Sequence, residues 1–178
     1  KKTVLVCLIP ALMLLVENAI GTESSGTQLP SPAERLYRKG FSFVPPPEKG
    51  WAIIGDEEYR LTLQRTVSEV SDNAYVIEAQ LRESPTARTP KEFLETIQER
   101  RSKAKDADRI KVLLREEMLL GRISDYCVKF YVKAEDRGAP KITKRVGPML
   151  LESIGAYCRH PAYPKFAVYL SYTHRFYE

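Results

Sequence analysis

Residues 149–175 read MLLESIGAYCRHPAYPKFAVYLSYTHR, and this stretch decides the fold. Two strand-like runs, Met149–Arg159 and Phe166–Arg175, flank the segment His160–Lys165, which includes two prolines. Proline has no N–H to donate and a fixed φ, so it ends a strand ladder. The stretch therefore predicts the closing strand pair of an antiparallel sheet. It also contains both histidines and one of the three cysteines, so any chemistry of the chain is expected here.

The segments before this pair alternate apolar and polar residues over most of their length. Such a period of two is typical of a sheet with one buried and one wet face, which favours antiparallel pairing. The alternating segments are residues 51–54, 59–64, 75–82 and 124–134, with a brief strand at 41–44 before three prolines. We expect a mostly antiparallel sheet of about six or seven strands that begins as a meander.

Two capping boxes predict helices. Thr89–Glu92 combines an N-cap threonine, a proline at the first helical position and a glutamate at the third. An apolar stripe follows, which predicts one long helix over about residues 89–106, packed on one face of the sheet. Ser31–Glu34 repeats the pattern and predicts a short N-terminal helix that ends before Gly40. Residues 109–116 suit a continuing helix or a strand, and we favour the strand. The predicted fold class is α+β.

The N-terminus has the order of a secretory signal peptide. Two lysines precede the apolar run Thr3–Val16, and small and polar residues follow it. We predict a signal peptide over residues 1–21, a flexible Ser/Thr/Gly linker over 22–30 and a single α+β domain over 31–178. An uncleaved anchor is the main alternative, although a spanning helix needs roughly 20 apolar residues. An uncleaved or lipidated N-terminus is the only membrane attachment that we expect.

Composition argues against several classes of function. The chain carries a net charge of +5, but basic and acidic residues alternate, as they do over residues 99–106. This pattern indicates a solvated face and no nucleic-acid partner, since nucleic-acid binding favours a basic stripe. The sequence has no G-x-S-x-G, H-E-x-x-H, Gly-rich phosphate loop or C-x-x-C motif. We therefore assign no catalytic residue and no cofactor.

Two cysteines, Cys127 and Cys158, remain after the predicted signal peptide. Disulfides persist outside the cytosol, and an even pair in an exported chain suggests one bridge. The two residues can meet only if their strands are neighbours in the right register. The alternative is a pair of buried thiols that act as small apolar side chains.

Four segments, GFSFVPPPEKGW, DYCVKFYVKAEDRG, AYCRHP and VYLSYTHR, resemble in that order a set of uncharacterised bacterial exported proteins, some of them lipoproteins. The resemblance covers most of the chain after the predicted signal peptide. It implies a periplasmic or secreted place and a structural cysteine pair, and it implies no activity, substrate or cofactor. A sheet crossed by one helix is also similar to the sandwich of the photosystem PsbP and Mog1 class, which is an analogy of fold and not of function.

The sequence leaves two hypotheses for function. The first is an exported, non-catalytic domain that binds or scaffolds in the cell envelope. The alternative is a metal-binding protein or metal-dependent enzyme that uses Cys158, His160 and His174, because a thiolate and two imidazoles suit zinc or copper. That alternative requires Cys158 to be unbridged.

Tyrosines crowd the end of the chain, and tyrosine is enriched at contact surfaces because it combines apolar area with a polar tip. β-propensity alone also explains them. The binding hypothesis predicts a face for an acidic or sugar-like cell-envelope partner, formed by Arg159, His160, Tyr163, Tyr169, His174 and Arg175.

Overall fold

The computed structural model describes residues 26–67, 72–103, 108–138 and 147–177. The predicted signal peptide lies outside these ranges. The strands are β1 (Thr27–Gln28), β2 (Leu36–Arg38), β3 (Phe41–Phe43), β4 (Ala52–Glu57), β5 (Arg60–Thr66), β6 (Ala74–Glu83), β7 (Ile110–Leu119), β8 (Cys127–Asp136), β9 (Met149–Arg159) and β10 (Phe166–Phe176), and the helix is α1 (Pro90–Ser102).

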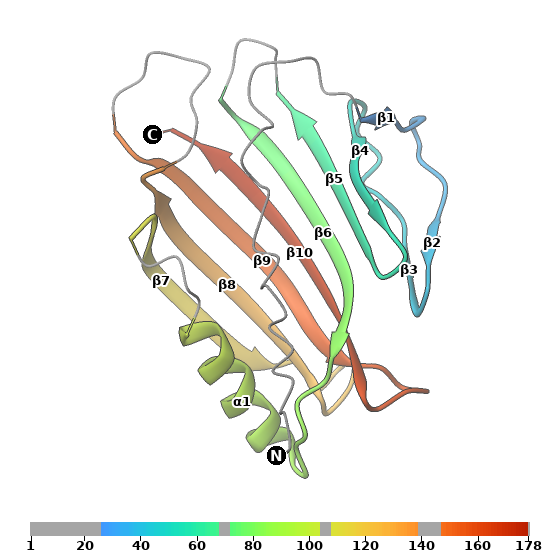
Figure 1. Cartoon of the computed structure of the whole chain (residues 1–178), viewed down its shortest axis with the longest axis vertical. Coiled ribbons are helices and arrows are strands. Elements are labelled where there is room, and N and C mark those ends of the chain that lie inside the picture. The colour runs from blue at the N-terminus through green and yellow to red at the C-terminus, as the bar shows by residue number, and fades with distance from the viewer. Residues whose placement is uncertain (1–25, 68–71, 104–107, 139–146, 178) are drawn as a thin grey trace, which may run out of the picture.

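Eight of the strands form one antiparallel sheet in the order β1-β4-β5-β6-β10-β9-β8-β7 (Figure 1). Two meanders make up this sheet, β4 to β6 and β7 to β10, and they join where β10 pairs with β6. At that seam Leu170 of β10 lies opposite Ala79 of β6 on one side and Ala156 of β9 on the other. The closing pair predicted from residues 149–175 is confirmed, and it lies in the middle of the sheet.

The α+β class is wrong. Of the described residues, 54% lie in strands and 10% in the one helix found among them, so the fold is mostly β. The sheet has eight strands where about six or seven were expected, because Thr27–Gln28 adds an edge strand and residues 110–119 form a full strand. The strand favoured for residues 109–116 is confirmed, and the alternative of a continuing helix is wrong.

The predicted N-terminal helix does not form. The Ser31 hydroxyl donates to the Pro47 carbonyl at 2.7 Å, so it does not cap a helix. The next residues build the β2–β3 hairpin, which turns at Gly40 with φ at 85°. A strand packs Leu36, which is partly buried, against the cluster around Trp51, and this tertiary contact overrides the local capping signal. Part of the predicted linker is also ordered, since Thr27 pairs with Ile53.

The capping box at Thr89 is confirmed. The Thr89 hydroxyl accepts from the Glu92 N–H at 3.1 Å, and the Glu92 carboxylate accepts from the Arg88 N–H at 2.7 Å. The helix ends at Ser102 and is therefore shorter than the expected 89–106. It is the connection between the two meanders, because it follows β6 and precedes β7.

The two faces of the sheet are covered by different elements. Residues directly opposite each other on paired strands share a face, so Leu61, Leu63 and Ile77 lie on one side, which we call the hairpin face. There they pack with Trp51 against the β2–β3 hairpin and form the first core cluster. This cover extends over β4 to β6, and it includes Tyr172 of β10 at its margin.

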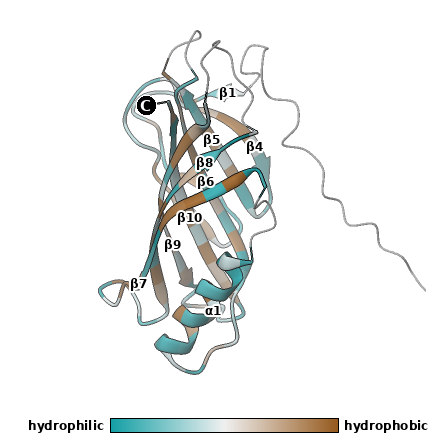
Figure 2. Ribbon diagram, turned by 90° about the vertical axis from the view of Figure 1, so that its left-hand side faces the viewer, coloured by the Kyte–Doolittle hydropathy of each residue, from teal (hydrophilic) through white to brown (hydrophobic). Residues whose placement is uncertain are grey.

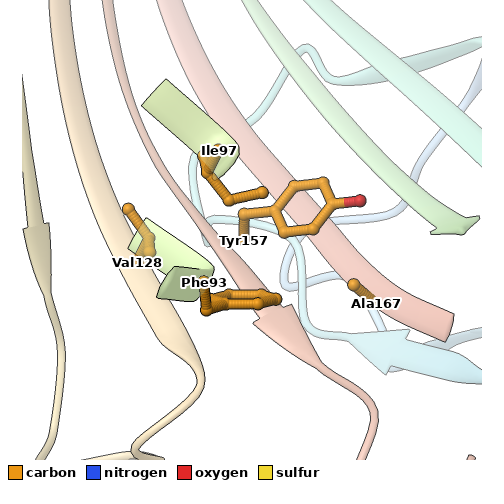
Figure 3. Packing of buried hydrophobic residues seen from close by; sticks show 5 residues of the cluster. All are labelled: Phe93, Ile97, Val128, Tyr157 and Ala167. Carbon is orange, nitrogen blue, oxygen red and sulfur yellow. The ribbon is translucent and has the colours of Figure 1, made fainter. Parts of the chain in front are cut away.

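The other side, which we call the helix face, carries the second core cluster. Phe93 and Ile97 of α1 are buried against Val128, Tyr157 and Ala167 of β8, β9 and β10 (Figure 3). The helix therefore packs on the half of the sheet that the hairpin does not reach, on the opposite face and toward one end of the strands (Figure 1).

Glycine has a packing role at position 155. A Cβ at Gly155 would collide with the Phe130 ring and with the Leu170 carbonyl. Without it, the Phe130 ring lies close over β9 and stacks on Tyr169 of β10 with centroids 5.7 Å apart. The guanidinium of Arg101, in the last turn of α1, lies 3.9 Å from the Phe130 ring centroid, so this contact extends the core along the helix face to the end of α1.

Candidate functional site

The cysteines predicted to pair form a disulfide. Cys127 of β8 and Cys158 of β9 are direct cross-strand partners, with Cα atoms 4.0 Å apart. Cys127 is fully buried, although its strand pattern placed it on the more polar face. The bridge is consistent with an oxidising compartment. It also occupies the sulfur that the metal hypothesis needs as a thiolate.

The two histidines lie far apart. His174 is opposite Glu152 on β9, and His160 follows the end of that strand, so about 25 Å of strand separates them. The His160 Nδ1 accepts from the N–H groups of Ala162 and Tyr163 at 3.1 Å, which makes it a turn residue. Nowhere in the described ranges do three or more metal-ligating side chains gather.

His174 lies in an aromatic stack on the hairpin face. Its ring is stacked between Tyr75 and Phe176, with centroids 4.5 Å away on each side. Tyr75 in turn contacts Tyr172, which meets Trp51 edge to face. The stack continues the core cluster of the hairpin, so His174 contributes to packing.

Arg159 holds a loop in place. Its guanidinium donates to the carbonyls of Pro85 and Ala87 at 3.1 and 3.0 Å. It also lies over the Tyr126 ring at 4.0 Å and the Phe93 ring at 5.2 Å. These contacts fasten the connection between β6 and α1 to the sheet, which explains an arginine here without any ligand.

The adjacent Tyr157 offers a test of this packing. Its hydroxyl donates to the Glu83 carbonyl at 2.8 Å, and burial raises the pKa of the phenol above its usual value near 10. The unfolded chain therefore ionises first as the pH rises, and the stability that the neutral phenol contributes is lost above about pH 10. We expect urea midpoints to fall between pH 9 and 11, and to fall less steeply in Tyr157→Phe. Parallel slopes in the two proteins would contradict this role.

The six residues of the predicted binding face do not form one surface. Arg159, Tyr169 and Arg175 lie on the helix face, whereas His174 lies on the hairpin face. Tyr169 is held between Phe130 and Arg82, whose guanidinium is 4.1 Å from the ring. Burial lowers the pKa of Arg175, so its guanidinium is partly removed from water. His160 and Tyr163 lie together at the β9–β10 turn, where Tyr163 is exposed.

A different surface has the character of a binding site. On the hairpin face the cover ends at β6 and Tyr172, and the C-terminal meander presents its side chains to solvent. Register places these side chains on one side, because Ile154 is opposite Tyr131 and Tyr172 while Leu170 is opposite Ala156. We call this surface the open patch. Its members are Leu114, Met118, Tyr131, Ile154 and Leu170, of which the four aliphatic residues are 39% to 52% exposed.

Charged residues lie among the apolar ones in the open patch. Lys129 is opposite Met118, and Lys133 is opposite Leu114 and pairs with Glu152 at 3.6 Å. Glu116 lies opposite Tyr131. The patch contains a shallow depression of about 180 Å³ between β7, β8 and β9. Small-molecule pockets usually measure about 300–1,000 Å³, so the depression suits a protruding side chain better than a cofactor.

The sequence contains a partial signal for this patch. Alternation shows that Met118, Ile154 and Leu170 are apolar strand residues, but it predicts burial for them. Whether they are buried depends on how far the β2–β3 hairpin reaches across the sheet, and that hairpin was expected to be a helix followed by one strand.

Comparison with protein-family models, curated proteins and solved structures finds no match to this chain. Across the described ranges, no helix has the length and the apolar character needed to span a membrane.

Proposed function

We propose that this protein is an exported, non-catalytic domain that binds a protein partner of the cell envelope through the open patch. One observation carries the proposal: the hairpin face is covered over β4 to β6 and left open over β7 to β10, where apolar side chains remain exposed. Exposed apolar patches rimmed by polar residues mark interaction sites more often than accidents of folding.

The chemistry of the patch indicates the kind of partner. Methionine and tyrosine are enriched at protein interfaces, and Met118 and Tyr131 line the depression. Lys129, Lys133, Glu116 and Glu152 place charges of both signs beside the apolar residues, which suits a partner with an apolar centre and a rim of mixed charge. A face four strands wide spans roughly 15–20 Å, enough for an interface of standard size.

Export is supported by two features. The Cys127–Cys158 bridge is of the kind that persists outside the cytosol, and the N-terminal residues have the order of a signal peptide. The partner is therefore sought in the envelope of the producing cell.

Site-specific photocrosslinking in that cell tests the proposal. A photoreactive phenylalanine analogue at position 154 or position 118 is expected to yield one shared protein adduct, because both positions lie in the patch. The matched control is Val44, which is 53% exposed but lies beside the hairpin. Position 44 is expected to give no such adduct.

A second variant makes the result specific. Ile154→Lys, introduced into the chain that carries the analogue at position 118, places a charge in the patch and is expected to reduce the adduct at least tenfold. Val44→Lys in the same chain is expected to leave it unchanged. Equal adducts from positions 44 and 154, or no effect of Ile154→Lys, would overturn the proposal.

A further inference from the structure

The two edges of the sheet differ in a way that points to self-association. At one edge β1 is a strand of only two residues, whereas β7 at the other edge has ten. Natural sheets protect their edges with very short strands, and β1 conforms to this. β7 pairs only with β8 among the described strands. In Figure 2, which looks onto this side of the molecule, β7 runs along the front and α1 lies beside it.

The outer side of β7 offers backbone groups for pairing. The Leu120 N–H donates to the Cys127 carbonyl at 2.7 Å, so Leu120 and Cys127 are a hydrogen-bonded pair of the β7–β8 ladder. Hydrogen-bonded and non-hydrogen-bonded pairs alternate along antiparallel strands. The N–H and C=O groups of Arg115, Glu117 and Leu119, which belong to non-hydrogen-bonded pairs, therefore point away from β8. They form a short row that a further strand can join.

The side chains of β7 do not guard this edge. Half of its ten residues are large, exposed apolar residues, namely Val112, Leu113, Leu114, Met118 and Leu119. Two of its charged residues already have partners within the chain, since Glu117 bonds to Arg101 at 2.8 Å and Lys111 lies 3.8 Å from Glu135. The register shift between Val112 and Leu114 interrupts the edge, and the regular stretch from Leu114 to Leu119 that follows it is a template for strand addition.

We propose that β7 pairs with β7 of a second copy of this chain, antiparallel and centred on Glu116. Outward backbone groups at residues 115 and 117 then bond across the interface. On the helix face this register places Arg115 opposite Glu117 of the second copy, twice by symmetry. On the hairpin face the same register places Leu114 opposite Met118 of the second copy. The charges on the helix face and the apolar residues on the hairpin face are thus self-complementary.

Arg115 supports this register in particular. Its Nε has no hydrogen-bond partner among the described residues, and Glu117 of the second copy lies opposite it in the pairing. The Glu117 carboxylate already accepts from Arg101 of its own chain through one oxygen, and its second oxygen leaves acceptor capacity for Arg115. Moving the centre by one residue, to Arg115 or to Glu117, still pairs outward backbone groups but sets two arginines or two glutamates face to face on the helix face. Centring on Glu116 leaves one like-charged pair, Glu116 of the two copies, which lies on the hairpin face where water screens it.

The dimer does not depend on the proposed function. Pairing at β7 covers the edge of the sheet and leaves the open patches exposed. The two patches become one continuous surface, with Leu114 and Met118 of both copies at its centre.

A cysteine at the symmetry axis tests the inference directly. In Glu116→Cys the two new thiols face each other in a non-hydrogen-bonded pair, where Cα atoms are about 4.5 Å apart and a disulfide can form. With the full chain and a mild oxidant, we expect a covalent dimer on non-reducing gels, at least tenfold more than in Val44→Cys, which has the same background of cysteines. Unchanged thermal unfolding confirms that both variants fold.

A second variant tests the repulsion between Glu116 of one copy and Glu116 of the other. Glu116→Gln removes that repulsion and is expected to tighten the dimer about two- to fivefold by analytical ultracentrifugation at neutral pH. Equal cross-linking at positions 44 and 116, a monomer at all concentrations, or weaker association of Glu116→Gln would overturn the dimer. An adduct to a different protein at position 116 without a dimer would also overturn it. The adduct with a different protein that is expected at positions 118 and 154 does not depend on these outcomes, and a self-adduct at position 118 reports the dimer, so the two proposals fail separately.

Discussion

Replacing Cys127 and Cys158 together by alanine is expected to lower the free energy of unfolding by about 2–4 kcal/mol. The bridge joins residues 31 positions apart on β8 and β9, and without it the unfolded chain regains the entropy that the closed loop had removed. Alanine is the suitable replacement because Cys127 is fully buried and a serine hydroxyl there would lose its water without a new partner. Urea unfolding of the two proteins measures the difference.

Reductant provides the control for this experiment. Dithiothreitol is expected to bring the native protein close to the stability of the double variant and to leave the double variant unchanged. Peptide mapping after alkylation without reductant should find neither Cys127 nor Cys158 modified. Two alkylated cysteines at these positions, or equal midpoints of unfolding, would mean that the bridge is absent from the purified protein.

Replacing Phe93 by alanine is expected to cost about 3–5 kcal/mol, the range for deleting a large buried aromatic side chain. Phe93 is fully buried and is the main contact through which α1 is attached to the sheet. Its ring meets Tyr126 edge to face at 5.8 Å and lies beneath the Arg159 guanidinium. The cavity removes both contacts, so α1 and the loop that Arg159 holds are expected to loosen together.

The matched control lies on the same helix. Lys91 is 84% exposed, and Lys91→Ala is expected to change the stability by less than about 0.5 kcal/mol. Hydrogen exchange is expected to rise in residues 90–102 of Phe93→Ala before it rises in β9 and β10. A loss below about 1 kcal/mol for Phe93→Ala would show that the helix is not held by this contact.

These two effects are expected to be coupled. Val128 and Tyr157, which pack on Phe93, directly follow and precede the bridged cysteines on their strands. The pair Cys127–Cys158 lies on the hairpin face and the pair Val128–Tyr157 on the helix face, so one end of β8 and β9 is fastened on both sides. Residues that share partners in this way give non-additive losses of stability.

The strands could be predicted because their signal is local. Alternation located β5 and β6, and the proline-containing segment between two strand-like runs located β9 and β10, each to within a residue or two. Thr89–Glu92 located the start of α1. The prediction of an N-terminal helix was wrong although Ser31-Pro32-Ala33-Glu34 carries the same local signal as Thr89–Glu92. The reason is that packing of Leu36 against the cluster around Trp51 favours a strand. A capping box contributes about 1 kcal/mol, and burial of large side chains on a sheet outweighs it.

The candidate site likewise separates what the local sequence predicts from what the tertiary structure decides. From the residues alone, Cys158, His160 and His174 were a possible metal set, and Arg159 to Arg175 a possible binding face. The register of the strands rules out the metal set, because it places Cys158 opposite Cys127, to which it is bridged, and separates the two histidines by most of a strand. The aromatic and arginine side chains are explained mainly by packing.

The sequence by itself determined that the chain is a sheet protein, where most of its strands and its long helix begin, and which cysteines can pair, because alternation, capping and residue type act over a few neighbouring residues. Only the tertiary structure decided strand order, how far the β2–β3 hairpin and α1 reach across each face, and therefore that the open patch and the β7 edge are exposed. Exposure depends on which distant segments cover a strand, and no local pattern records that.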